Sequence, residues 1–538
     1  GFAVYQYDLA KDKYTKYGEY SFTSYNWSSG DYFEQKLYLE TGLEYSNTFD
    51  EKHNVTALFL GNRNSRIIRN FIGFADQGLV GRLTYDFDKR YFGEFNVGYN
   101  GSENFAKGKR YGFFPAFSGG WLISNEKFIA SNTNLQKYIS LLKIRGSLGW
   151  VGNDKYGDIY QSGDQDNMFM YFLSFTNGSC PVFVSGNTSF GGIYQGKVAN
   201  EDVTWETGRK MNLGFESSFF REKIGFNMDL FHERRVDILT DISSIIPSHV
   251  GASFKASNVG IVENKGVEFE VVHRGNIGKD FNYSVKGNYS FTKNKVVKKA
   301  DPAGMLAYQK EEGYSIGVPL TYKYIGIFQD YADIYSSPNQ MTLPGNVEVK
   351  PGDLKYLDFN NDGQIDINDA FRQGYGSVPE VQYGITLSVN FQNFDFSVMI
   401  QGSARSQFGK NWEIMWPFSN ADNVYEKHWR YWSPEMAGNE EFIRLYGAYQ
   451  NNEPGGASGS TYSYSSGDYV RLKTFEVGYT LPKKAISKLY MSSVRVYFSG
   501  NNVLSWIKDP YLDPDNRDQR GGVMPPTRAF NFGVNINF

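Results

Sequence analysis

Apolar and polar side chains alternate along many stretches of the chain, most clearly in the last eleven residues. From residue 530 to residue 538, one face of an extended strand carries only apolar side chains, while the other face carries asparagine and glycine. The apolar positions are Phe530, Phe532, Val534, Ile536 and Phe538. In an outer-membrane barrel such a strand turns its apolar face to lipid and its polar face to a wet lumen. The pattern therefore favours a membrane-spanning β-strand.

The same period of two recurs in pairs of segments that are joined by short turns. The clearest pairs are 79–87 with 91–99, 213–219 with 224–230, 267–271 with 281–291, and 381–391 with 394–401. Weaker candidates are 1–10, 14–24, 33–47, 53–62, 112–123, 141–151, 468–480 and 492–500. Together with the last strand, these segments predict about seventeen strands.

Long connections alternate with the short turns. They span 152–204, 236–256, 296–379, 402–467 and 501–527. Bacterial outer-membrane barrels combine short periplasmic turns with long extracellular loops in this way, and five such loops are unusual in a soluble domain. We therefore predict an all-β fold, a transmembrane antiparallel β-barrel. If the short turns and the end of the chain lie in the periplasm, the first predicted strand runs toward the periplasm and the number of strands is odd. A single-chain barrel needs an even number, so we expect further strands to precede residue 1.

Composition narrows the class of protein further. Aromatic residues make up 17% of the chain, with 40 Tyr, 43 Phe and 9 Trp, and the mean hydropathy is −0.48. Barrel strands need only alternate apolar residues, so a hydrophilic average is compatible with membrane insertion. The net charge of −3 gives no reason to expect a nucleic-acid partner. The single cysteine, Cys180, excludes an internal disulfide framework.

Several motifs, in a fixed order, carry a resemblance to a known family. Residues 85–105 read YDFDKRYFGEFNVGYNGSENF, and residues 109–126 read KRYGFFPAFSGGWLISNE. They are followed by LLKIRGSLGWVGN at 141–153, TWE at 204–206, NKGVE at 264–268, GYSIGVPL at 313–320, PGDLKYLD at 351–358 and RAFNFGVNINF at 528–538. Jointly these motifs resemble SusC/RagA-like TonB-dependent outer-membrane transporters, from about residue 85 to the end.

The resemblance implies a barrel of about 22 strands, closed by an N-terminal plug and energised by the TonB complex. It also implies a SusD-like surface lipoprotein as a lid, with oligosaccharide as the usual cargo and oligopeptide in some members. The resemblance is also compatible with a dimer of transporter–lipoprotein pairs. The expected location is the outer membrane of a gram-negative bacterium. The chain shows no plug and no TonB box, so the functional expectation applies to the parent molecule.

The strongest local motif is DFNNDGQIDIND at residues 358–369. It has the spacing of a twelve-residue calcium loop, with oxygen donors at Asp358, Asn360, Asp362, Gln364 (through its carbonyl), Asp366 and Asp369. The last position is Asp where the usual loop has Glu, which predicts a weaker closure. We expect a structural Ca²⁺ site that stiffens the extracellular loop 296–379. The alternative is a solvated acidic turn.

The second candidate constellation lies in the aromatic-rich extracellular loop 402–467. It contains Trp412, Trp416, Trp429 and Trp432, which suit contact with a cargo or with the lid lipoprotein. The spacing of Trp429 and Trp432 also fits a packed surface helix. Phe538, the terminal aromatic residue, resembles the C-terminal signal that barrel-assembly machinery recognises.

Catalysis finds no support in the sequence, because the five histidines are scattered and no nucleophile or phosphate-loop motif is present. We therefore expect a transporter and no enzyme. Two alternatives stay open. A passive porin fits the barrel pattern but not the family resemblance. A surface adhesin or lectin built of β-sandwiches would give regular short strands without the alternation of short turns and long loops.

Overall fold

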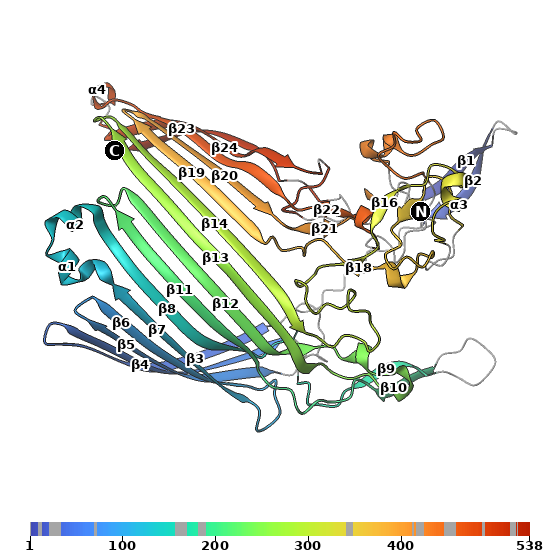
Figure 1. Ribbon diagram of the computed structural model, residues 1–538, viewed down its shortest axis with the longest axis horizontal. Helices are drawn as coiled ribbons and strands as arrows, with labels where there is room; N and C mark the ends of the chain where they lie inside the picture. Colours follow the sequence, from blue (N-terminus) through green and yellow to red (C-terminus); the bar gives the residue numbers. More distant parts are fainter. Residues whose placement is uncertain are drawn as a thin grey trace.

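A single large antiparallel sheet dominates the computed structural model of the chain (Figure 1). The structure describes residues 2–8, 13–20, 34–68, 73–156, 169–180, 190–340, 348–410, 414–415, 424–445, 459–486, 490–509, 511–516, 523–524 and 526–538. The sheet has 15 strands, and each is paired with its neighbours in chain order. They are β3 (Glu34–Phe49), β4 (His53–Ile68), β5 (Phe74–Phe87), β6 (Tyr91–Ser102), β7 (Tyr111–Leu122), β8 (Ile139–Asn153), β11 (Glu206–Phe219), β12 (Ile224–Thr240), β13 (Ser257–Ile277), β14 (Phe281–Lys298), β19 (Val381–Phe391), β20 (Phe394–Ala404), β23 (Tyr469–Thr480), β24 (Ser493–Ile507) and β25 (Ala529–Asn537).

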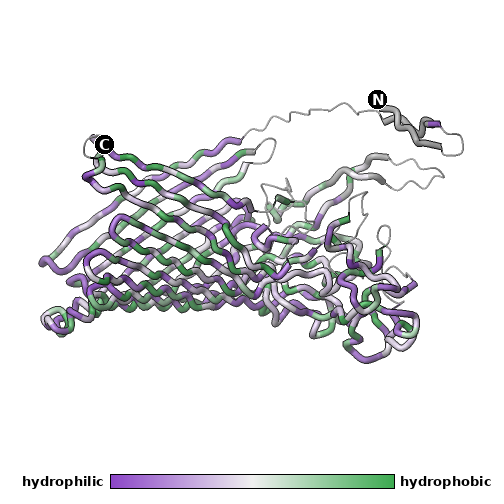
Figure 2. Tube along the Cα trace, turned by 90° about the horizontal axis from the view of Figure 1, so that it is seen from above, coloured by the Kyte–Doolittle hydropathy of each residue, from purple (hydrophilic) through white to green (hydrophobic). Residues whose placement is uncertain are grey.

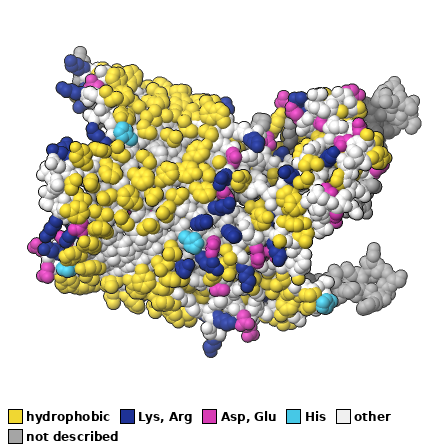
Figure 3. All heavy atoms as spheres, viewed as in Figure 1, with side chains coloured by type: hydrophobic (Ala, Val, Ile, Leu, Met, Phe, Trp, Pro, Cys, Tyr) yellow, Lys and Arg dark blue, Asp and Glu magenta, His cyan; other side chains and the backbone are white. Residues whose placement is uncertain are grey.

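Register keeps apolar side chains on one face of the sheet. Leu213 on β11 pairs with Leu230 on β12, which pairs with Val267 on β13, and Val267 pairs with Phe291 on β14. Because side chains alternate along a strand, the neighbouring polar residues fall on the opposite face. Figure 2 shows this alternation along the strands, and Figure 3 shows one face of the sheet covered by hydrophobic side chains. These two faces are the lipid-facing and lumen-facing sides of an outer-membrane barrel wall.

The two ends of the wall differ in their connections. One end, which we call the turn end, carries tight turns such as 50–52, 88–90, 278–280 and 392–393, and the short helices α1 (Lys127–Ala130), α2 (Thr133–Tyr138) and α4 (Lys483–Ile486). The opposite end, the loop end, carries the long connections, as the sequence predicts. Two connections at the loop end are shorter than this rule suggests, at 69–73 and 103–110.

Several strands are longer than a membrane requires and longer than their sequence patterns predicted. β13 has 21 residues and β14 has 18, where alternation predicted only 267–271 and 281–291. A tilted strand crosses the membrane in about 9–11 residues. Residues 257–266 of β13 and 292–298 of β14 extend the wall at the loop end, where the outward positions become polar, and residues 272–277 of β13 continue to the turn end.

The first two strands lie outside this sheet. β1 (Phe2–Asp8) and β2 (Lys13–Tyr20) pair with each other in a separate hairpin, although the alternation at 1–10 and 14–24 was counted toward the barrel. No helix among the described residues is long and apolar enough to cross a membrane.

Residues of the long connections 299–380, 405–468 and 508–528 pack together at the loop end, and we call their described parts the cap. The cap contains the paired strands β15 (Leu320–Thr321) with β18 (Phe371–Arg372), β16 (Tyr324–Ile327) with β17 (Leu354–Tyr356) and β21 (Gln407–Gly409) with β22 (Tyr464–Ser466), and the helix α3 (Tyr331–Tyr335). A further pair, β9 (Phe175–Cys180) with β10 (Phe190–Gln195), lies in the connection after β8.

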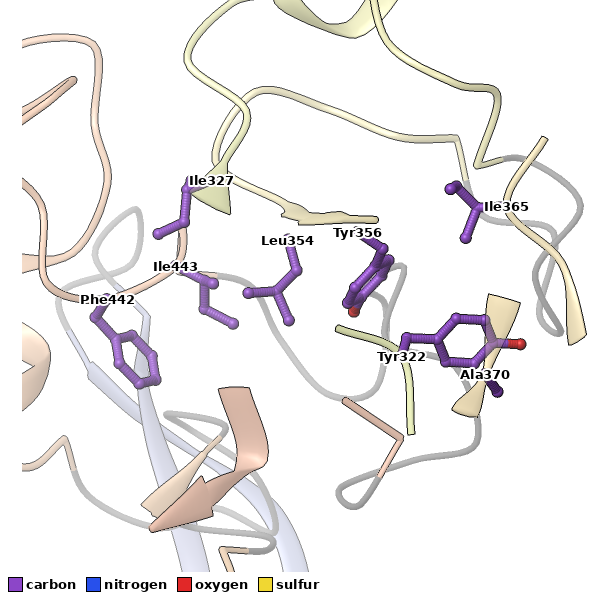
Figure 4. Packing of buried hydrophobic residues seen from close by; sticks show 8 residues of the cluster. All are labelled: Tyr322, Ile327, Leu354, Tyr356, Ile365, Ala370, Phe442 and Ile443. Atoms are coloured by element: carbon purple, nitrogen blue, oxygen red, sulfur yellow. The ribbon is translucent and has the colours of Figure 1, made fainter. Parts of the chain in front are cut away.

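The cap has a hydrophobic core of its own (Figure 4). Its main cluster joins two connections that are distant in sequence, and consists of Tyr322, Ile327, Leu354, Tyr356, Ile365, Ala370, Phe442 and Ile443. A second cluster brings Leu512 of the third connection against Phe408, Ile414 and Met415. Tyr462 packs against both clusters. The three connections therefore fold as one body and not as independent loops.

Candidate functional site

The lumen-facing side of the wall is held by ion pairs that reach across a glycine. Arg145 on β8 extends over Gly214 on β11 to Asp229 on β12, with an Nη2 to Oδ1 distance of 2.8 Å. Its Nε also donates to Glu216 at 2.7 Å. A Cβ at position 214 would lie only 2.6 Å from the Arg145 guanidinium carbon, so any other residue there would force the guanidinium to move. The arrangement makes this part of the wall polar and rigid.

A second network of this kind lies on the same lumen-facing side, toward the other edge of the sheet. Arg495 on β24 extends over Gly478 on β23 to Asp395 on β20, where its Nε lies 3.0 Å from Oδ1. Glu476 provides a second acceptor at 2.5 Å. Charge-assisted hydrogen bonds of this kind are stronger than neutral ones. Both networks present fixed charges to the lumen.

A polar recess of about 290 Å³ lies where the lumen-facing wall meets the cap. The side chains around it include the amides of Asn288, Gln382 and Gln401, with Tyr469 and Asp515 at the cap side. Gln401 donates to the Tyr469 hydroxyl at 3.2 Å. Amide groups beside an aromatic ring can bind the hydroxyls of a sugar or the backbone of a peptide.

Arg471 fixes the cap to the wall beside this recess. It is 1% exposed, and its guanidinium binds Asp513 at 2.6 Å and Asp515 at 2.5 Å. Its Nε donates to Ser505 on β24 at 2.9 Å. The sequence analysis missed Arg471, because its partners belong to a connection without a periodic pattern. The only signal in that connection is its three closely spaced aspartates, at positions 509, 513 and 515.

The calcium-type motif forms a tight turn in the cap. Asp358 accepts hydrogen bonds from the backbone N–H of Asp362 at 3.2 Å and of Gly363 at 2.8 Å. Asn361 and Gly363 adopt positive φ values of 59° and 83°, which let the chain turn sharply around the Asp358 carboxylate. Asn360 and Asp362 accept from the next residue but one, at 3.0 and 2.9 Å. The side-chain oxygens of the motif thus accept hydrogen bonds from the backbone of their own turn.

Asp369 closes the motif from inside the cap. Its carboxylate is fully buried and accepts from the backbone N–H of Phe359 and of Asp366, both at 2.8 Å. Asp366 in turn accepts from the N–H of Asn368 at 2.7 Å. Among the described residues, no three Asp, Glu, His or Cys side chains gather closely enough to hold a metal ion. The donor set fits Ca²⁺ in type and spacing, but its carboxylates here bind backbone amides.

The four tryptophans of the candidate contact set do not share one environment. Trp412 and Trp416 lie outside the described residues. Trp429 is 78% exposed. Trp432 is half-buried against the main cap cluster and stacks over Gly352, so it packs the cap. Only Trp429 therefore offers a free aromatic surface among the described members of the set.

Phe538 follows the closing strand β25 on its apolar side. Its side chain is 86% exposed, and its backbone oxygen lies 3.4 Å from the Ser492 hydroxyl. Phe530, Phe532 and Val534 precede it on the same face, and Phe530 stacks on Phe498 of β24. The terminal ring thus continues the lipid-facing row.

Comparison with known proteins connects this geometry to a function. The chain is 27% identical over 488 residues to TonB-dependent receptor P3 of Formosa agariphila, which covers 86% of this chain. It is 24% identical over 484 residues to TonB-dependent receptor SusC of Bacteroides thetaiotaomicron. A solved structure of the RagAB peptide transporter matches 94% of the chain with a TM-score of 0.69, at 17% identity. The chain is therefore SusC/RagA-like. Its location is the outer membrane of a gram-negative bacterium.

The chain spans about half the length of the relatives it matches. It covers 45% of receptor P3, 43% of SusC and 56% of the RagAB chain. No protein-family model matches the chain. These relatives are named as receptors or transporters.

Proposed function

We propose that the protein to which this chain belongs imports oligomeric nutrients across the outer membrane by TonB-dependent active transport. Glycans are the proposed cargo, with oligopeptides as the second choice. A SusD-like surface lipoprotein serves as its lid at the loop end. The observation that carries the proposal is the continuous polar lumen wall, which ends in an amide-lined recess directly beneath the cap. The similarity to SusC and to the RagAB transporter supports it.

Uptake in living cells tests this proposal and separates it from a passive porin. Cells carrying the intact protein are given fluorescent oligosaccharides and, separately, fluorescent oligopeptides, with and without a functional TonB complex. Active import predicts that uptake of one cargo class disappears when TonB is lost. Uptake that persists without TonB contradicts the proposal and identifies a porin. Co-purification of a surface lipoprotein with the intact protein tests the lid.

The recess provides a residue-level test of cargo contact. Gln382→Ala removes an amide at the loop end of β19, whereas Asn390→Ala removes one from the same lumen-facing side near the turn end. The loss of one cargo hydrogen bond costs about 0.5–1.5 kcal/mol, which is up to about tenfold in affinity. We expect half-saturation of uptake to rise for Gln382→Ala alone. Equal effects of both variants contradict a cargo contact in the recess.

We also propose that residues 358–369 bind Ca²⁺ as a structural clip of the cap. The spacing of hard oxygen donors, the positive φ values at Asn361 and Gly363 and the buried Asp369 support this assignment. Binding would require the carboxylates of Asp358 and Asp362 to turn toward a common centre while keeping part of their hydrogen bonds.

Titration of the intact protein with CaCl₂ tests the clip. We expect heat release and greater protease resistance of the cap with Ca²⁺, both lost on chelation and in Asp358→Asn. Glu435→Gln, which removes an exposed carboxylate elsewhere in the cap, is the matched control and should behave as the unchanged protein. Protease resistance that is the same with Ca²⁺ and with chelator contradicts the clip.

A further inference from the structure

A belt of basic side chains lies on the lipid-facing side of β11 to β14, directly beyond the apolar rows. The register places His232, Lys265 and Lys293 side by side in one row, next to the row of Leu230, Val267 and Phe291. The following outward row contains Arg209, Arg234, Glu263 and Lys295. We call the six basic residues of these two rows the basic belt. Figure 3 shows basic side chains gathered between the hydrophobic field and the loop end.

Most of the basic belt is not neutralised within the protein. Arg234 is bonded to Glu263, the only carboxylate in the two rows. Arg209, Lys265, Lys293 and Lys295 are exposed and have no acidic partner among the described residues. Concentrated like charges repel one another unless counter-charges are present. The belt therefore has an excess of positive charge that an external anion can balance.

The basic belt begins at the position where a strand finishes crossing the membrane. On β13 the outward positions from Val267 to Ile277 carry no Lys, Arg, Asp or Glu, and this stretch has 11 residues. A tilted strand needs about 9–11 residues to span the hydrocarbon. Lys265 is the next outward position after Val267, so it lies at the level of the headgroups on the loop side, which is the outer leaflet.

Along β11 to β14 the outward lysines and arginines lie only on the loop side of the apolar rows. At the turn end of the same strands the outward residues are Ile224, His273, Tyr283 and Ile277, without a lysine or arginine. On β19 and β20 the outward residues at the loop end are apolar or aromatic, as at Tyr383 and Ile400. Among these four strands the outward lysines and arginines therefore lie in one leaflet only, and Arg63 on β4 is a further exposed outward arginine at the loop end.

We propose that the basic belt binds the phosphate groups of anionic lipids in the outer leaflet. The lipid is an acylated, phosphorylated one, whose chains contact the apolar rows while its phosphates contact Lys265, Lys293 and Lys295. Cationic residues near an anionic membrane surface each contribute about a fivefold gain in affinity. The bound lipid thereby fixes the height and orientation of this part of the wall. This inference concerns lipid and is independent of the imported cargo.

Nanodiscs test the proposal with the intact protein. They contain phosphatidylcholine with a minor fraction of either bisphosphorylated lipid A or the same lipid without phosphates, and native mass spectrometry counts the lipids retained. We expect the triple variant Lys265→Gln, Lys293→Gln, Lys295→Gln to retain phosphorylated lipid A at least about tenfold less well. The phosphate-free lipid should be retained equally by all variants.

A matched triple variant replaces lumen-facing lysines: Lys143→Gln, Lys210→Gln and Lys286→Gln. It removes the same charge from β8, β11 and β14, and we expect it to retain lipid A like the unchanged protein. Equal losses in both triple variants, or no loss in the outward variant, overturn the proposal. Displacement of the lipid by millimolar inorganic phosphate alone would indicate a free-anion site. Loss of association between two copies, with lipid retention unchanged, would indicate a protein interface; either result overturns it.

Discussion

The wall and the cap are stabilised by different kinds of contact. In the wall, every strand pairs with the next wall strand along the chain, and backbone hydrogen bonds and alternation of apolar with polar side chains specify the register. In the cap, residues far apart in sequence form the core, as Leu354 and Ile443 do, and short strands contribute little. The wall is thus held by local pairing and the surrounding lipid, whereas the cap depends on a few buried contacts between connections.

This difference makes single substitutions act differently in the two regions. The wall distributes its hydrogen bonds over 15 strands, so the removal of one side chain leaves the ladder intact. The cap concentrates its stability in its core and in a few ion pairs, such as Arg444 with the fully buried Asp353 at 2.5 Å. We expect the cap to open while the wall stays assembled, and not the reverse.

The largest effect is expected from Arg444→Ala. The change leaves the Asp353 carboxylate buried with its Lys350 N–H bond at 2.9 Å but without its cation, and losing one partner of a buried pair costs about 3–5 kcal/mol. We expect rapid protease cleavage in the cap of the intact protein, with normal heat-modifiable migration of the barrel. Burial already raises the pKa of Asp353 above its usual value, so part of the cost is relieved at acidic pH, where the carboxyl becomes neutral.

An exposed ion pair of the same cap is the control for this prediction. Arg430 and Glu441 form a pair in which both side chains are more than half exposed. Exposed pairs contribute about 0–1 kcal/mol, so Arg430→Ala should leave cleavage nearly unchanged. Similar cleavage of the two variants would show that buried ion pairs do not hold the cap.

A charge on the lipid-facing side tests the wall. Leu83 is an outward residue in the middle of β5, and Thr84 is its lumen-facing neighbour. A lysine at the lipid-facing position costs about 2–4 kcal/mol near the bilayer centre. Leu83→Lys should therefore reduce the amount of assembled barrel in the outer membrane, measured by heat-modifiable migration, whereas Thr84→Lys should not. Equal assembly of both would refute the assignment of the two faces.

The terminal residue offers a smaller test on the same wall. Phe538 is exposed and makes few contacts, so Phe538→Ala should cost little stability in the finished barrel. As a recognition signal for assembly it should nevertheless matter for the amount of protein in the outer membrane. We expect fewer copies with unchanged transport per copy. Normal surface levels would contradict a signal role.

The same contrast explains what the sequence could predict. Strands such as β19 and β20 alternate strictly between lipid and lumen, so the period of two located them almost to the residue. Beyond the membrane that constraint ends, and the upper half of β13 was missed for this reason. The cap core gave no periodic signal, because Leu354 and Ile443 become neighbours only after two distant connections fold together. For the same reason, the sequence could not show whether Trp432 packs inside the cap or contacts a partner at the surface.

Alkaline pH provides the finest test of the cap. Burial, with smaller contributions from Asp366 and Asp369, raises the pKa of Tyr322 from 10.0 to about 12. A raised pKa means that the neutral hydroxyl stabilises the folded cap fully below pH 10, and that this contribution is lost as the pH rises toward about 12. The hydroxyl has no hydrogen-bond partner among the described residues, so Tyr322→Phe should be tolerated at neutral pH. Protease cleavage of the cap should then increase between these pH values in the unchanged protein and less in Tyr322→Phe, while the wall stays assembled in both. Identical pH profiles would mean that the deprotonation of Tyr322 is not linked to opening of the cap.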